Sequence, residues 1–225
     1  MGAYELLLKA VRSRNIFQRN KLPLERKVLA CLLYMAGLSY RAMTFRTGLI
    51  EASHVAVHYW FHKLKGLICD EPPKVRRCVA VDESKLKEDG YQLFIWSAID
   101  VDTKEYLAVY ASYQRSSLNA YLFMRKVLVR CVGKPLILVD GGPWYSWVLD
   151  RLGLRWEHVT FGRRNPIERL FRTVKERTKG FYNNIPARVH KLVNVTFFLE
   201  IFAFWYNHLR RHESLGRVPT EVTLF

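Results

Sequence analysis

Two stretches of strand-forming residues in this chain each end in an aspartate. Asp82 follows the run in VAVDES, and Asp140 follows the run in LILVDGG. Both runs are continuously apolar, which is typical of strands in the middle of a sheet that is covered on both faces. An acid at the end of such a strand is costly unless another group pairs with it. These segments predict a sheet-centred fold in which acidic groups emerge at the ends of central strands.

The neighbouring segments complete an α/β prediction. Two further strands, YQLFIWSAIDV and KEYLAVYAS, are joined by a polar turn at 102–104, and a later strand is expected in RWEHVTF. Helices are expected over 118–131, 166–179 and 188–210, and a helix or turn over 144–152. Three hairpin-linked strands followed by alternating helices and strands describe a mixed sheet flanked by helices.

Residues 23–70 have a helical pattern instead. Three short helices are expected, separated by glycine turns at Gly37 and Gly48, and the third begins near Ser53. This arrangement resembles a small all-α helix-turn-helix domain, whose third helix enters a DNA groove. A trihelical or dimerisation bundle would give the same pattern. The candidate DNA contacts of this domain are Arg41, Arg46, His54, His58 and Lys63.

Proline content and charge divide the chain. The prolines of CDEPPKVRR cannot continue a helix, so the domain boundary is placed there, between 23–70 and 71–225. Residues 1–22 are basic and weakly patterned, and we expect them to form a flexible or DNA-contacting arm. His54, His58 and His62 share helical spacing. No carboxylate or cysteine is near them in sequence, which favours groove-facing histidines over a metal site.

The overall charge points to a polyanionic partner. The chain carries 36 Lys and Arg against 20 Asp and Glu, a net charge of +16. This favours nucleic acid, although membrane surfaces and acidic proteins attract the same charge. The four cysteines form no CxxC pair, as expected for reduced thiols in the cytoplasm. No secretory signal is evident, and the two apolar stretches, VLACLLYMAGL and VTFFLEIFAFWY, are too short to cross a bilayer. We expect a soluble intracellular protein with no membrane partner.

A third acid, Glu168, opens the basic helical segment RRNPIERLFRTVKERTKG. Arg172 and Lys175 follow it at i+4 and i+7 on the same helix face, where they can hold a DNA backbone; an ordinary salt-bridged helix is the alternative. With Asp82 and Asp140, the three acids can hold two Mg²⁺ ions, or Mn²⁺ in their place, because such cations prefer oxygen ligands. Two ions of this kind support in-line phosphoryl transfer, so the set predicts a nuclease or a DNA strand-transfer enzyme.

Other acids compete for these roles. Glu83, Asp102 and Glu176 lie close to the candidates in sequence. Asp100 is the strongest rival because it also follows a strand, but its place in a hairpin turn makes it the weaker choice.

The motifs together resemble a known family. VAVDESKL, WSAIDVDTKEYLAVYAS, LILVDGGPWY and the C-terminal YNHLRRHESLGRVPTE are similar to DDE transposases of the prokaryotic IS6 (IS26/IS240-like) insertion-sequence family, particularly the archaeal type. The resemblance runs from about residue 22 to the C-terminus. It implies an RNase H-like catalytic core of the retroviral-integrase type and an N-terminal helix-turn-helix domain that recognises terminal inverted repeats.

The resemblance also implies a mechanism and partners. It implies Mg²⁺-dependent 3′-end cleavage and strand transfer into target DNA, with Asp82, Asp140 and Glu168 as metal ligands and Lys175 as a DNA contact. It further implies double-stranded DNA as partner, a homodimer or higher oligomer on DNA, and a place in the prokaryotic cytoplasm with the nucleoid. Two features depart from the family pattern. The step from Asp140 to Glu168 is 168 − 140 = 28 residues, which is short, and Gly-Gly follows Asp140.

Two alternatives remain open from the sequence. One is an inactive or domesticated transposase that only binds DNA, against which the intact acid trio argues. The other is an RNase H-like nuclease that cuts without joining, against which the N-terminal helical unit argues.

Overall fold

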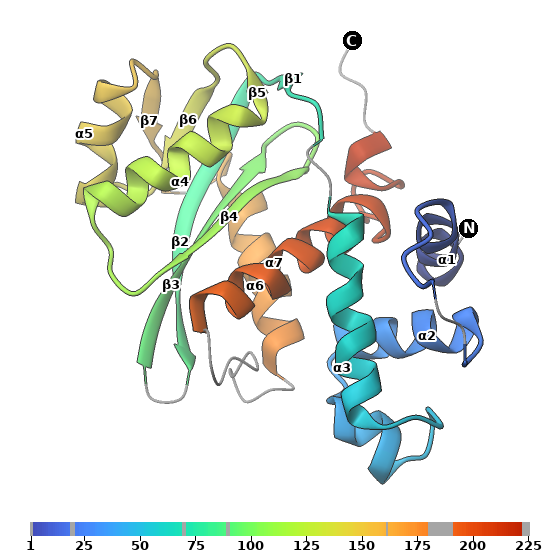
Figure 1. Ribbon diagram of the computed structural model, residues 1–225. Coiled ribbons are helices and arrows are strands. Elements are labelled where there is room, and N and C mark those ends of the chain that lie inside the picture. The colour runs from blue at the N-terminus through green and yellow to red at the C-terminus, as the bar shows by residue number, and fades with distance from the viewer. Residues whose placement is uncertain are drawn as a thin grey trace.

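A mixed five-stranded sheet lies at the centre of the C-terminal part of the chain (Figure 1). The computed structural model describes residues 2–18, 21–68, 71–88, 91–160, 162–179 and 191–221. The strand order is β4-β3-β2-β6-β7, in which β2, β3 and β4 pair antiparallel while β6 runs parallel to β2 and β7 parallel to β6. The mixed sheet predicted from the sequence is confirmed. The strands are β2 (Cys78–Glu88), β3 (Tyr91–Asp100), β4 (Tyr106–Ser112), β6 (Leu136–Val139) and β7 (Trp156–His158), with a separate parallel pair of β1 (Lys74–Val75) and β5 (Cys131–Val132).

Helices cover both faces of this sheet. Successive strand residues point to opposite faces, so β2 supplies two separate cores. Val79 and Val81 pack in one core with side chains of α4 and α5, whereas Cys78 and Ala80 belong to the other, which includes side chains of α6 and α7. This explains why the run before Asp82 is continuously apolar. The covering helices are α4 (Ser117–Val129), α5 (Pro143–Arg151), α6 (Asn165–Lys179) and α7 (Lys191–His208).

Helix α7 lies between the sheet and the N-terminal helices (Figure 1). On one side its Phe202 ring lies 6.4 Å from Tyr106 of β4. On the other side its Phe198 ring lies 6.2 Å from Tyr34 and 6.3 Å from Phe61, which belong to the N-terminal helices. A helix covered on both sides needs no polar face, which accounts for its apolar sequence. Within the described part of the chain, no helix is long and apolar enough to span a bilayer.

The N-terminal region is helical, but its helices differ in part from the prediction. Its elements are α1 (Ala3–Ser13), α2 (Leu24–Met35), the π-helical η1 (Ala42–Arg46), α3 (His54–Lys63) and the 3₁₀ turn η2 (Leu64–Leu67). The second predicted helix is confirmed as a short one: residues 40–46 are helical, the last five of them π-helical, and the Ser39 hydroxyl accepts a hydrogen bond from the Ala42 N–H at its start. The third begins where expected, because the Ser53 hydroxyl accepts a hydrogen bond from the backbone N–H of Ala56 at 3.1 Å.

The prediction of a flexible arm over residues 1–22 is corrected in part by α1. Leu7 and Val11 of this helix are buried, and α1 packs against α2. These two residues stand at i and i+4, so they form an apolar stripe along α1.

The outer edge of β4 is covered by a side chain. The Asn207 amide of α7 donates to the Tyr106 carbonyl and accepts from the Tyr106 N–H, each at 2.8 Å, and Asn207 is buried. Both backbone groups of Tyr106 are therefore satisfied without another strand, which protects this edge from pairing with a further chain. A last 3₁₀ turn, η3 (Pro219–Glu221), packs against α7, where the Thr220 hydroxyl donates to the Asn207 carbonyl.

Candidate active site

The three acids singled out from the sequence line one open cleft of about 1000 Å³. Strand pairing explains how two of them meet. Strands β2 and β6 are adjacent and parallel, and their last paired residues are Ala80 and Leu138. Asp82 and Asp140 each stand two residues beyond this pair, so they lie side by side where β6 ends. The expectation that a strand ends at Asp82 is wrong, because β2 continues to Glu88 in antiparallel pairing with β3. Glu168 reaches the cleft from the first turn of α6.

A fourth acid lies closer to the two aspartates than Glu168 does. Among the described residues, carboxylate oxygens of Asp82, Glu83 and Asp140 all lie within 4.8 Å of one another, whereas Glu168 lines the cleft outside this group. The sequence marked Glu83 only as a nearby acid. The sequence feature that could have identified Glu83 as a site residue is its position next to Asp82 on a strand that is buried on both faces.

Asp82 is a partly buried acid that forms an ion pair with Arg164. Arg164 places its guanidinium Nη2 2.9 Å from the Asp82 Oδ2 and is itself buried. Burial of the carboxyl raises the pKa of Asp82 to about 7, with Asp140 and Glu83 acting in the same direction and Arg164 opposing them. Arg164 directly precedes α6, so this ion pair also ties the helix that carries Glu168 to β2.

Glu83 faces the other side of the sheet. Its side chain is 3% exposed and accepts hydrogen bonds from Arg115, Trp144 and Tyr145. Burial raises the pKa of Glu83, and the negative charge of Asp140 adds to the shift, while these hydrogen bonds oppose it.

The basic residues predicted beside Glu168 lie in the same cleft. Arg172 and Lys175 line it from α6, together with Phe171 and Glu176. The opposite side of α6 is buried through Ile167, Leu170 and Val174. This amphipathic pattern orients Glu168 and the two cations toward the cleft.

The N-terminal candidates lie elsewhere on the molecule. Arg41, Arg46, His54, His58 and Lys63 are all exposed and belong to η1, α3 or their flanks, and none of them lines the acidic cleft.

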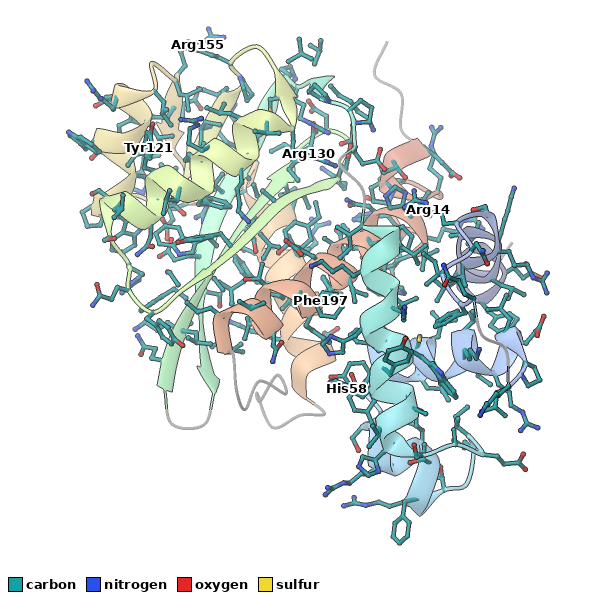
Figure 2. The ribbon with its side chains drawn as sticks, in the orientation of Figure 1. Arg14, His58, Tyr121, Arg130, Arg155 and Phe197 are labelled. Carbon is teal, nitrogen blue, oxygen red and sulfur yellow. The ribbon has the colours of Figure 1, made fainter. Side chains whose placement is uncertain are left out.

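Two aromatic contacts connect the C-terminal half of α3 to α7. The ring centroids of His58 and His62 lie 4.2 Å apart, and the His62 ring stacks on Phe197 of α7 at 4.7 Å. Figure 2 labels His58 on α3 and Phe197 on α7. Burial lowers the pKa of His58, so neutral imidazole is favoured there.

Three large apolar side chains on η1 and α3 are exposed, and the sequence did not single them out. They are Phe45, Val55 and Tyr59, which are 89%, 62% and 57% exposed.

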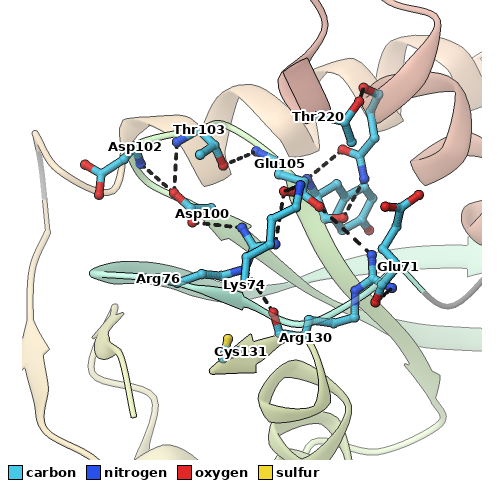
Figure 3. A network of polar contacts seen from close by, with 12 residues as sticks. Glu71, Lys74, Arg76, Asp100, Asp102, Thr103, Glu105, Arg130, Cys131 and Thr220 are labelled. Atoms are coloured by element: carbon cyan, nitrogen blue, oxygen red, sulfur yellow. Dashed lines mark hydrogen bonds and ion pairs between the residues drawn. The ribbon is translucent and has the colours of Figure 1, made fainter. Parts of the chain in front are cut away.

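Asp100, the rival candidate for a metal ligand, is engaged by other groups of the protein (Figure 3). Its Oδ2 lies 2.9 Å from Arg76 Nη1, and its Oδ1 accepts hydrogen bonds from the backbone N–H groups of Asp102 and Thr103. Asp100 is fully buried and does not line the acidic cleft. Its carboxylate closes the turn between β3 and β4.

Acids on two adjacent central strands of a mixed sheet, Asp82 within β2 and Asp140 directly after β6, with a further acid on the covering helix, define an enzyme site on an RNase H-like fold. Among solved structures, the chain matches the simian T-cell lymphotropic virus intasome in complex with PP2A regulatory subunit B56 gamma, with a TM-score of 0.50, 15% identity, and coverage of 85% of this chain and 73% of that one. The HTLV-2 integrase catalytic core domain in complex with magnesium matches with a TM-score of 0.44 and 13% identity, over 67% of this chain and 97% of that one.

The sequence comparisons give the family. The family model DDE_Tnp_IS240, described as a DDE domain, matches residues 76–190. An uncharacterized protein of Methanocaldococcus jannaschii, MJ0017, is 41% identical over 207 residues, which cover 92% of this chain and 96% of the relative. An uncharacterized protein of Aquifex aeolicus, aq_aa24, is 43% identical over 51 residues, 23% of this chain and 42% of the relative. The chain belongs to the IS240-like DDE transposase family, and it is a transposase-type enzyme.

Proposed function

We propose that this transposase binds the terminal inverted repeats of an insertion sequence and catalyses 3′-end cleavage and strand transfer into target DNA. The observation that carries the proposal is the cleft in which Asp82, Asp140 and Glu168 face the cations Arg172 and Lys175. Acids for metal binding and cations for phosphate binding are the two components that DNA phosphoryl transfer requires.

The donor set of the cleft fits Mg²⁺, with Mn²⁺ as its substitute. Carboxylate oxygens are the ligands that these hard cations prefer. Burial raises the pKa of Asp82, and the neighbouring acids Asp140 and Glu83 add to the shift, so an added cation would favour the ionised form of this carboxyl. Asp82, Asp140 and Glu168 would hold the metal, and we propose two ions. When bound, such ions activate the attacking oxygen and stabilise the leaving oxygen of an in-line displacement.

The protein side chains have their own tasks in this proposal. The three acids fix the position of the reacting phosphate through the metal site, and Arg172 and Lys175 neutralise phosphates of the DNA backbone along α6. The attacking group is water or a DNA 3′-hydroxyl, so no side chain has to act as a nucleophile.

We assign recognition of the DNA ends to the N-terminal helices. In this assignment α3 enters a groove with His54 and His58, while Arg41, Arg46 and Lys63 contact the backbone. The exposure of these side chains supports it. The lowered pKa of His58 suits a neutral imidazole that reads a base edge better than one that neutralises a phosphate.

The proposed reaction also bears on the oligomeric state of the protein and on its place in the cell. Strand transfer joins two DNA ends to one target, so we propose a homodimer or higher oligomer on double-stranded DNA, in the prokaryotic cytoplasm and associated with the nucleoid.

A strand-transfer assay tests the proposal. Labelled DNA ends of the flanking element, a plasmid target and Mg²⁺ are incubated with the wild type, with Glu168→Gln, or with Glu213→Gln, an exposed residue outside the cleft as a control for the same loss of charge. We expect joined product from the wild type and from Glu213→Gln, and none from Glu168→Gln. Binding of the ends without cleavage would support a DNA-binding protein instead, and cleavage without joining would support a nuclease.

A further inference from the structure

Glu83 is a buried acid to which the proposed reaction gives no task. It follows Asp82 on β2, and the two side chains point to opposite faces of the sheet. Asp82 pairs with Arg164 at the start of α6, whereas Glu83 contacts the first turn of α5. Its side chain is almost fully enclosed, so an ionised carboxylate there requires compensating partners.

The partners of Glu83 anchor the segment that carries Asp140. The Glu83 Oε2 accepts hydrogen bonds from Trp144 Nε1 at 3.3 Å and from the Tyr145 hydroxyl at 3.2 Å. Both donors stand in the first turn of α5, directly after Asp140, Gly141 and Gly142. The pairing of β6 with β2 holds the chain before Asp140 in place, and the hydrogen bonds of Glu83 hold the start of α5, which follows Asp140.

The turn between these two anchors is tight. Gly141 has a φ of +86°, and a Cβ atom added there would lie 2.8 Å from the His158 Nε2. Only glycine adopts this conformation in this space without strain. The position of Asp140 therefore depends on where α5 begins, and the contacts of Glu83 fix that point.

Arg115 completes the arrangement from a third segment. Its Nη1 lies 3.3 Å from the Glu83 Oε1, and its guanidinium carbon lies 4.5 Å from the Trp144 ring centroid and 4.9 Å from that of Phe94. Arg115 thus compensates the buried charge of Glu83 and stacks on the same tryptophan that Glu83 binds. Both oxygens of Glu83 are engaged by protein donors.

We propose that Glu83 is a positioning residue that sets the distance between the Asp82 and Asp140 carboxylates, and thereby the affinity of the site for its divalent cation. The inference rests on the proposed metal-dependent function. Glu83 holds its two neighbours in place and is not itself a ligand. Outer partners of this kind change metal affinity or activity by about 10–100-fold when they are removed.

Direct metal titration of the full-length protein tests this assignment without DNA chemistry. Mn²⁺ binding is measured by isothermal titration for the wild type, Glu83→Gln, Asp82→Asn and the surface control Glu213→Gln. We expect Glu83→Gln to bind Mn²⁺ about tenfold more weakly, with an unchanged melting temperature in the absence of metal. Strand transfer by this variant should recover as the metal concentration is raised, which damage to the fold would not produce. Asp82→Asn should not recover.

Three outcomes would overturn the positioning role. If Glu83→Gln binds Mn²⁺ with wild-type affinity, the contacts of Glu83 with α5 do not influence the metal site. If Glu83→Gln loses strand transfer as completely as Asp82→Asn and no metal concentration restores it, Glu83 is a metal ligand. If Glu83→Gln does not fold, Tyr145→Phe decides, because it removes one hydrogen bond and keeps the ring. Weaker Mn²⁺ binding by Tyr145→Phe supports the role, and unchanged binding refutes it. A wild type that binds Mn²⁺ but does not join DNA would overturn strand transfer alone.

Discussion

Two groups of acids lie in the same sheet, one fully buried and one partly exposed, and their charges are compensated differently. Asp100 and Glu105 are fully buried, and Arg76 lies 2.9 Å from one and 3.0 Å from the other (Figure 3). Lysine and arginine side chains lie around the same pair. Asp82, in contrast, has Arg164 as its close cation and two further carboxylates as neighbours. Glu105 of the first group has three cations within 4.0 Å, although its Oε1 has no hydrogen-bond partner among the described residues. In the second group, the described ion pairs of Asp82 and Glu83 are with one arginine each, Arg164 and Arg115.

This difference separates structural acids from functional ones. Burial of a charge is tolerated when ion pairs and hydrogen bonds satisfy it, as they do around Asp100. Carboxylates that are held together without enough cations shift their pKa upward and gain from an added divalent ion. Asp82 and Asp100 both come after apolar runs in the sequence, so the sequence pattern alone does not distinguish them; their burial and the surrounding cations do.

The largest expected effect comes from neutralising the functional group. Asp82→Asn removes a proposed metal ligand, and we expect cleavage and joining to fall by about a thousandfold or more, because such an ion supplies several kcal/mol of transition-state stabilisation. Binding to DNA ends, measured by gel shift, should stay close to wild type. Asp102→Asn, in the turn outside the cleft, is the control and should keep its activity. A simultaneous loss of end binding in Asp82→Asn would contradict the separation of the two tasks.

Removing the cation of the structural group should damage the fold instead. Arg76→Met leaves Asp100 and Glu105 buried with less compensation, and we expect the free energy of unfolding in urea to fall by about 3–5 kcal/mol. The neighbouring Arg77 is the matched control, because its side chain is 72% exposed and pairs with Asp102 at 2.6 Å. Arg77→Met should shift the unfolding midpoint far less. Equal shifts in the two variants would remove the distinction between the clusters.

The local parts of this picture were predictable from the sequence. The apolar runs before Asp82 and Asp140 predicted central strands, and the i+4 and i+7 spacing after Glu168 predicted the cationic face of α6, because each pattern depends on neighbouring residues alone. The contacts of Glu83 and Arg164 depend on the parallel register of β2 and β6 and on the docking of α5 and α6. These contacts join segments that are distant in sequence: Arg164 and Asp82, for example, are 164 − 82 = 82 residues apart. No local periodicity encodes such a contact.

The N-terminal region divides in the same way. The caps of its second and third helices were predictable, because Ser39 and Ser53 accept hydrogen bonds from backbone N–H groups three residues later. The apolar stripe of Leu7 and Val11 is also a local pattern, which the interpretation of residues 1–22 as a basic arm passed over. The packing of α1 against α2 joins two separate segments, and no local pattern encodes it.

The smallest expected effect, and the most direct measure of the charge deficit, is the pH dependence of metal binding. Burial and two neighbouring acids raise the pKa of Asp82 from 3.8 in its ordinary state to about 7. The folded protein therefore binds this proton more tightly than the unfolded chain does. The stability that Asp82 contributes is fully present below about pH 4 and is lost as the pH rises to about 7 in the absence of metal.

A divalent ion must displace the same proton, which fixes the sign for binding. The Mn²⁺ affinity should rise by about tenfold per pH unit below about pH 7 and then level off, with about one proton released per bound ion on the acidic side. Titrations in buffers of different ionisation enthalpy count that proton. Arg76→Met should show the same pH profile as the wild type, since the structural cluster takes no part in metal binding. An affinity that does not change between about pH 5.5 and pH 7 would mean that Asp82 is already ionised, and that the two clusters differ less in charge than their neighbours indicate.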